Sequence, residues 1–303
     1  MTITDITSDA ATIPGVTHHT FQSADAVLHY VTAGAEGSPI LLVHGWPETW
    51  WAFRSVIPLL AASHRVVAVD LRGFGDSTAS EGDYTASEGD YTVEASAEDL
   101  HRLIEHVGHG AVHLATQDLS GGLAIRFAAT HPEDVLSFIG TETTFPGYGM
   151  EMLADVNNGG SWHLGFYGTP GIPEMLLPGH ERAVLEWAYA VMGADAASVT
   201  VSDFDEFERT YGRPHAERGP AGLYRSLFTD NGDLREVLHQ HPLSVPILAI
   251  DGPNHPFTEM TLRQVSENVT AVHIDGVGHL VAQQAPKAFA DALLEFTARI
   301  DRH

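Results

Sequence analysis

Short runs of β-branched and other apolar residues alternate along this chain with segments of helical periodicity. Six runs are predicted as buried strands: PILLVHG (39–45), RVVAVDL (65–71), AVHLAT (111–116), VLSFIGT (135–141), VPILAID (245–251) and AVHID (271–275). Strands that alternate with helices form a mostly parallel sheet flanked by helices on both faces. The pattern therefore predicts an α/β fold, to which AVLHYVTAG (26–34) adds an antiparallel edge strand.

Apolar side chains recur at three- and four-residue spacing within 53–60, 100–107 and 293–300, which predicts helices there. Pro286 suits the first position of the last helix. The interval 144–238 breaks the alternation, because it is rich in Gly, Pro and aromatic residues and contains no convincing parallel strand. We expect a core of residues 1–143 and 239–303 with a helical cap, 144–238, inserted over the ends of the sheet.

The stretch TASEGDYTASEGDY (78–91) is a tandem duplication of one seven-residue unit. Two copies are too few for a repeat architecture, so the duplication is expected to lengthen an acidic surface loop.

The composition excludes several classes of function. A net charge of −25 argues against nucleic acid or an anionic membrane as a partner, and the absence of cysteine excludes disulfides and thiolate chemistry. No apolar run approaches membrane-spanning length, and the start of the chain lacks the features of a secretory signal. We therefore expect a cytoplasmic protein without a metal, because no pair of histidines shows ligand spacing on one helix with an acid.

The stretch VHLATQDLSGGLAIRF (112–127) predicts a strand that turns sharply into a helix. A nucleophile at such an elbow needs small residues two positions before it and two and three positions after it, since the backbone crowds there. Ser120 fails this rule, because Asp118 precedes it and Leu123 follows it at those positions. Asp118 satisfies it better, with Thr116 before it and Ser120 and Gly121 after it. The alternative is that Asp118 is only the N-cap of the helix.

Partners for Asp118 follow other predicted strands. LLVHGWP (41–47) places the backbone N–H of Trp46 where it can join that of Leu119 in an oxyanion hole. In VHIDGVGHLVAQQAP (272–286), His279 follows the last strand and can act as a general base.

An acid that orients His279 commonly follows the strand VPILAID, but the turn there reads GPNH, with His255 in the acid's place. Glu142, just after VLSFIGT, is the leading candidate for this acid, and Asp251 is the reserve.

Together these residues resemble the α/β-hydrolase fold over about 21–300. They resemble more narrowly its aspartate-nucleophile branch of epoxide hydrolases and haloalkane dehalogenases, and most closely the Cif-like bacterial epoxide hydrolases. SWHLGFYG and GLYRSLF match the cap histidine and cap tyrosine of that group, here His163 and Tyr224. The resemblance implies an epoxide hydrolase without a cofactor, in which these two side chains donate hydrogen bonds to the opening ring. It also leaves a homodimer open as the assembly.

Departures from the family pattern rank the alternatives. Dehalogenases usually carry a tryptophan or an arginine directly after the nucleophile, where this chain has Leu119, so only Trp46 could contact a halide. A haloalkane dehalogenase is therefore the second hypothesis, followed by a serine esterase using Ser120 and by a non-catalytic ligand-binding protein.

Six aromatic residues in 144–238 predict an apolar pocket and hence a small hydrophobic epoxide as the substrate: Trp162, Phe166, Tyr167, Trp187, Tyr189 and Phe228.

Overall fold

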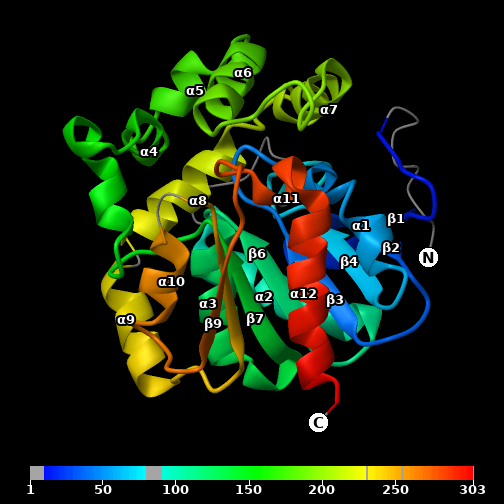
Figure 1. Ribbon diagram of the computed structural model, residues 1–303. Helices are drawn as coiled ribbons and strands as arrows, with labels where there is room; N and C mark the ends of the chain where they lie inside the picture. The colour runs from blue at the N-terminus through cyan, green and yellow to red at the C-terminus, as the bar shows by residue number, and fades with distance from the viewer. Residues whose placement is uncertain (1–9, 80–90, 230, 254–255, 303) are drawn as a thin grey trace.

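The computed structural model describes residues 10–79, 91–229, 231–253 and 256–302, and a nine-stranded sheet forms its centre (Figure 1). The strands are β1 (Thr17–Ser23), β2 (Ala26–Ala33), β3 (Pro39–Val43), β4 (Arg65–Val69), β5 (Thr78–Ala79), β6 (Val112–Gln117), β7 (Val135–Thr141), β8 (Ile247–Asp251) and β9 (Val269–His273). Their order is β1-β2-β4-β3-β6-β7-β8-β9, with β5 paired to β2. The strands from β4 through β3 to β9 run parallel. His255 and most of the duplicated stretch 78–91 lie outside the described residues.

Helices cover both faces of the sheet and the ends of its strands. In chain order the helices are η1 (Trp50–Phe53), α1 (Ile57–Leu60), α2 (Val93–Val107), α3 (Ser120–Thr130), η3 (Pro132–Asp134), η4 (Met150–Ala154), η5 (Val156–Asn158), α4 (Trp162–Gly168), α5 (Ile172–Leu176), α6 (Glu181–Val191), α7 (Val201–Tyr211), α8 (Arg218–Thr229), α9 (Asn231–Gln240), α10 (Phe257–Leu262), α11 (Val281–Gln284) and α12 (Pro286–Ile300). None of the helices in the described part of the chain combines the length and the apolar character that crossing a bilayer requires.

Alternate residues of each central strand belong to two separate cores, because successive side chains of a strand point to opposite faces. Ile40 of β3 packs in the same cluster as Leu293 of α12, whereas the next residue, Leu41, belongs to the cluster that contains Leu123 of α3. Figure 1 shows α12 in front of the sheet and α2 behind it. Both faces of the central strands are therefore buried, and most of their residues are apolar.

The six strands predicted from the sequence are all present, and so are the helices at 100–107 and 293–300. The segment 26–34 forms the antiparallel strand β2, but β2 is not the edge of the sheet, since β1 lies outside it. The continuous helix predicted over 53–60 is wrong, because the chain forms η1 and then the single turn α1. Pro58 explains the break, since its ring would clash with the carbonyl of Arg54 in a continuous helix.

The described residues between 144 and 238 contain helices and turns but no strand, as predicted. Helices α4 to α7 lie together above one end of the sheet, whereas α8 and α9 descend along its side (Figure 1). Helix α9 continues to Gln240 and so passes through the expected boundary at residue 238. The end of the sheet beneath α4 to α7 is where β6 leads into α3.

We expect Phe138→Ala to lower the free energy of unfolding by about 3–5 kcal/mol, because it leaves a cavity in the core. Phe138 lies at the middle of β7 and is 0% exposed, so the space left by its ring is enclosed by protein on all sides. Urea denaturation at neutral pH measures the change. The control is Leu59→Ala on α1, where the side chain is 39% exposed and a much smaller loss is expected. Equal losses in the two variants would contradict the placement of Phe138 in the core.

Candidate active site

Asp118 lies at the apex of a tight turn between β6 and α3. Its φ of 56° is in the left-handed region, which is rare for residues other than glycine and is found where a fold imposes strain. A Cβ on Gly45 would lie 2.4 Å from Cβ of Asp118, and one on Gly121 would lie 2.1 Å from Oγ1 of Thr143. The size rule used on the sequence therefore has a direct steric cause at Gly121.

Two alternatives for this turn are wrong in the structure. Ser120 is fully buried, and its hydroxyl lies 2.7 Å from the carbonyl oxygen of Gln117 and 3.1 Å from that of Val43. A serine held in this way cannot meet a substrate. Asp118 is not the N-cap of α3, since that position is Leu119 and no side chain caps the helix.

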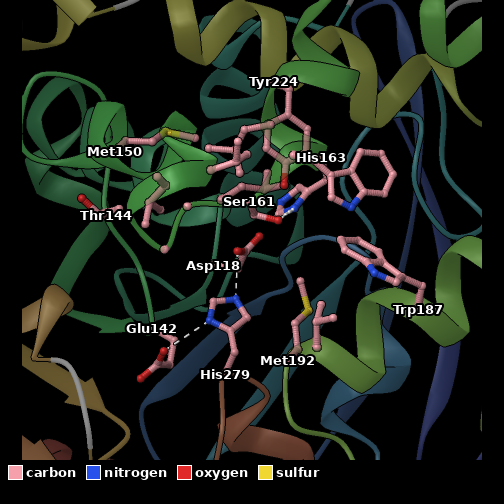
Figure 2. Close-up of a pocket in the computed structure, with 18 residues that line it drawn as sticks. Asp118, Glu142, Thr144, Met150, Ser161, His163, Trp187, Met192, Tyr224 and His279 are labelled. Atoms are coloured by element: carbon pink, nitrogen blue, oxygen red, sulfur yellow. Dashed lines mark hydrogen bonds and ion pairs between the residues drawn. The ribbon is translucent and has the colours of Figure 1, made fainter.

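The structure brings Asp118, His279 and Glu142 into one chain of contacts (Figure 2). Nε2 of His279 lies 2.9 Å from Oδ2 of Asp118, and Nδ1 lies 3.2 Å from Oε2 of Glu142. Asp118 and Glu142 directly follow β6 and β7, and His279 lies in the loop after β9. The ends of these parallel strands therefore bring the three residues to the same edge of the sheet. Glu142, like Asp118, has a positive φ, 45°.

Asp251, the reserve candidate for the acid, does not contact His279. It lies at the end of β8, where its two carboxylate oxygens accept hydrogen bonds from the backbone N–H groups of Thr258 (2.8 Å) and Glu259 (2.9 Å). Asp251 therefore anchors the start of α10. The turn after β8 instead contributes a hydrogen bond to Glu142, in which the N–H of Gly252 donates to Oε1 of Glu142 at 2.5 Å.

The charges of this group depend on one another. Burial lowers the pKa of His279, but hydrogen bonds and attraction from Asp118 and Glu142 outweigh it and raise that pKa to about 10. Burial raises the pKa of Asp118, yet the contact with His279 leaves it below its usual value. At neutral pH the resting site therefore holds an imidazolium between two carboxylates.

Two backbone N–H groups converge on Asp118, as expected from the sequence. The N–H of Trp46 donates to Oδ1 of Asp118 at 3.0 Å, and the N–H of Leu119 also bonds to this carboxylate. Oδ1 of Asp118 thus accepts a hydrogen bond from the N–H of Trp46, while Oδ2 faces His279.

His163 and Tyr224 lie on the other side of Asp118 from His279 (Figure 2). His163 lies in the first turn of α4 and Tyr224 lies within α8, and their rings meet edge to face with centroids 5.8 Å apart. Burial lowers the pKa of His163 to about 4, so this imidazole is neutral. Burial and the charge of Asp118 hold the pKa of Tyr224 well above its usual value, so its hydroxyl keeps its proton.

A cavity of about 610 Å³ opens above these side chains. Its wall is mostly apolar, with Met150, Leu153, Val156 and Met192 among the contributing residues. Of the six aromatic residues expected to form the pocket, Trp162 and Trp187 line this cavity. Tyr189 is instead packed in a separate cluster. Among the described residues that line the cavity, none is a lysine or an arginine.

Sequence reasoning missed a buried carboxylate near Asp118. Glu48 is 0% exposed, and its Oε1 accepts hydrogen bonds from the side-chain amides of Gln283 (2.8 Å) and Gln117 (3.2 Å). Burial and the charge of Asp118 raise its pKa to about 7. The available signal was a glutamate directly after HGWP within an otherwise apolar segment.

Two clusters of histidine and carboxylate groups lie outside the cavity and meet the spacing of metal ligands. They are His101 with His131 and Asp134, and His29 with Asp70 and Asp76. In each cluster a histidine already pairs with a carboxylate, His101 with Asp134 at 2.6 Å and His29 with Asp70 at 2.7 Å. The absence of a metal from this protein stays a prediction.

His279 makes stability depend on pH. Its pKa is raised from 6.5 to about 10 on folding, so its contribution is fully present below pH 6.5 and is lost as pH rises toward 10. We expect the advantage of the wild type over His279→Gln in free energy of unfolding to shrink across this window, as measured by urea denaturation at several pH values. A pH-independent difference would contradict the charged triad.

Known proteins match this chain over most of its length. A family model described as the alpha/beta hydrolase fold matches residues 38–170. The crystal structure of Cfl2 from Burkholderia cenocepacia is 30% identical with a TM-score of 0.83, and the match covers 93% of this chain and 96% of Cfl2. The structure of an epoxide hydrolase from Vigna radiata, 21% identical with a TM-score of 0.80 over 95% of this chain and 100% of that one, shows the same fold.

Two curated relatives are named as epoxide hydrolases. The soluble epoxide hydrolase of a Corynebacterium species is 28% identical over 93% of this chain and 98% of its own length. Human epoxide hydrolase 4 is 26% identical over 79% of this chain and 65% of its own length. The identity to Cfl2 over nearly all of both chains, together with the match to the family model, shows that this chain belongs to the α/β-hydrolase fold family.

Proposed function

We propose that this protein is a cofactor-independent epoxide hydrolase with Asp118 as its nucleophile. The observation that carries the proposal is the set of contacts of the Asp118 carboxylate, which has the N–H of Trp46 at Oδ1 and His279 at Oδ2. His163 and Tyr224 face it across the same cavity. The relatives named as epoxide hydrolases support the same activity.

In the first step, Oδ2 of Asp118 attacks a ring carbon and the carbon–oxygen bond breaks, which leaves an alkyl ester on the enzyme and an alkoxide. His163 and Tyr224 donate hydrogen bonds to the alkoxide oxygen, and one of the two gives it a proton. Both donors are suited to this role, because one is a neutral imidazole and the other a protonated phenol at neutral pH.

The second step becomes available only after the first. Ester formation removes the negative charge of Asp118, so one of the two charges that raise the pKa of His279 disappears. His279 can then release its proton, which passes through solvent to the cap donor that protonated the alkoxide, and take a new proton from water, which attacks the ester carbon. The N–H groups of Trp46 and Leu119 stabilise the charge on Oδ1. The bond between the ester carbon and Oδ2 breaks, and Oδ2 takes the proton from His279 and leaves as the second diol oxygen. The Asp118 carboxyl, which now holds the oxygen of water and its remaining proton, returns that proton to His279 and becomes a carboxylate again.

The substrate is an epoxide with an apolar substituent, since the cavity wall is mostly apolar and carries no lysine or arginine among the described residues. A volume of about 610 Å³ leaves room for a substituent larger than the small epoxide expected from the sequence. We also propose that 144–238 acts as a cap, because Trp162, His163 and Trp187 from this interval complete the cavity over the strand ends. Haloalkane dehalogenation has less support, since Trp46 is not among the residues that line the cavity.

A trapped ester tests the proposal. His279→Gln should form the ester and fail to hydrolyse it, so intact mass spectrometry after incubation with an apolar epoxide should show a gain of the mass of the epoxide. The matched control is Asp118→Asn with His279→Gln, which should show no gain. A panel of apolar epoxides that leaves the mass of His279→Gln unchanged would refute the proposal. Halide release from haloalkanes by the wild type would favour the dehalogenase instead.

Removal of either cap donor should slow the first step and spare the second. In the His279→Gln background, we expect Tyr224→Phe or His163→Gln to lower the rate constant of adduct formation by about a hundredfold, because each removes a donor to the alkoxide. Quenched-flow mass spectrometry measures this rate. An unchanged rate in both variants would remove these residues from the mechanism.

A further inference from the structure

We propose that Ser161 is a positioning residue that fixes the tautomer of His163, so that the ring presents Nε2–H to the oxygen of the opening epoxide. The inference rests on the proposed function, since it assigns a proton to one of the two cap donors. Oγ of Ser161 lies 2.5 Å from Nδ1 of His163, and both residues line the cavity (Figure 2).

Packing already restricts the orientation of the His163 ring. The indole of Trp46 stacks on one face, with centroids 4.7 Å apart and planes 21° from parallel. Tyr224 meets the ring at an interplanar angle of 76°. Because the plane of the ring is held in this way, the position of its proton decides whether Nε2 presents a hydrogen-bond donor or an acceptor to the cavity.

The hydroxyl of Ser161 determines which ring nitrogen of His163 carries the proton. In the described part of the chain, the Ser161 hydroxyl and the His163 ring are each other's sole side-chain hydrogen-bond partners. A proton on Nδ1 would leave the hydroxyl hydrogen without an acceptor among the described side chains, whereas a bare Nδ1 accepts it. Because His163 is neutral, its single ring proton then lies on Nε2.

This tautomer is the one that ring opening needs. The epoxide oxygen gains negative charge as its bond to carbon breaks, and an N–H donor stabilises that charge, whereas a bare Nε2 would repel it with its lone pair. Ester hydrolysis happens on the other side of Asp118, at His279, and does not use this proton. Ser161 should therefore affect one step of the reaction and not the other.

Nitrogen NMR reports the tautomer without any turnover. In ¹⁵N-labelled wild type, with the His163 signals assigned by comparison with His163→Gln, we expect a protonated Nε2 and a bare Nδ1. Ser161→Ala should shift the proton toward Nδ1, and Ser161→Thr should restore the wild-type spectrum. A protonated Nδ1 in the wild type, or identical spectra for wild type and Ser161→Ala, would overturn the inference. These outcomes are independent of whether any epoxide reacts.

Kinetics then separate positioning from a structural role. In the His279→Gln background, Ser161→Ala should lower the rate constant of adduct formation by about tenfold, and Ser161→Thr should recover most of it. With His279 present, the rate constant of ester hydrolysis should stay at the wild-type value. The control, Ser202→Ala, removes an exposed hydroxyl on α7 and should change neither step. Equal slowing of both steps by Ser161→Ala would assign Ser161 a structural role instead.

Discussion

The site depends on one electrostatic arrangement, a protonated His279 held between the carboxylates of Asp118 and Glu142. Two acids at neighbouring strand ends would repel each other without it, and both take left-handed backbone conformations that the fold must impose. The same arrangement orders the proposed chemistry in time. While Asp118 is charged it is a nucleophile and keeps His279 protonated, and only its conversion to an ester frees the base.

Much of this site could be predicted from the sequence, because its residues are tied to strand ends. In a parallel sheet, the strands deliver the residues that follow them to one edge, so Asp118, Glu142 and His279 could be named as candidates from their positions after strands. The size rule chose Asp118 over Ser120, and the steric conflict between a Cβ on Gly121 and Thr143 is the physical basis of that rule. The same reasoning failed over 53–60, where apolar spacing fitted a helix that Pro58 interrupts.

Contacts between side chains from distant segments could not be read in this way. Trp46 was chosen for its backbone N–H, but its indole also stacks on His163, more than a hundred residues away in the chain. The partners of Glu48 are Gln117 and Gln283, and the three are brought together only by the fold. Such pairs depend on rotamers and on the register of separate elements, for which a single sequence carries no periodic signal.

The contact between Gly252 and Glu142 has a wider consequence for how such chains are compared. The turn after β8, where the acid of related sites commonly lies, here contributes a backbone amide to an acid carried by β7. Adjacent parallel strands are only about 4.8 Å apart, so either strand end can present a carboxylate to the same imidazole. The absence of an acid from its usual position in an alignment is thus a poor sign of lost activity. A carboxylate at the end of the adjacent strand can contact the same histidine.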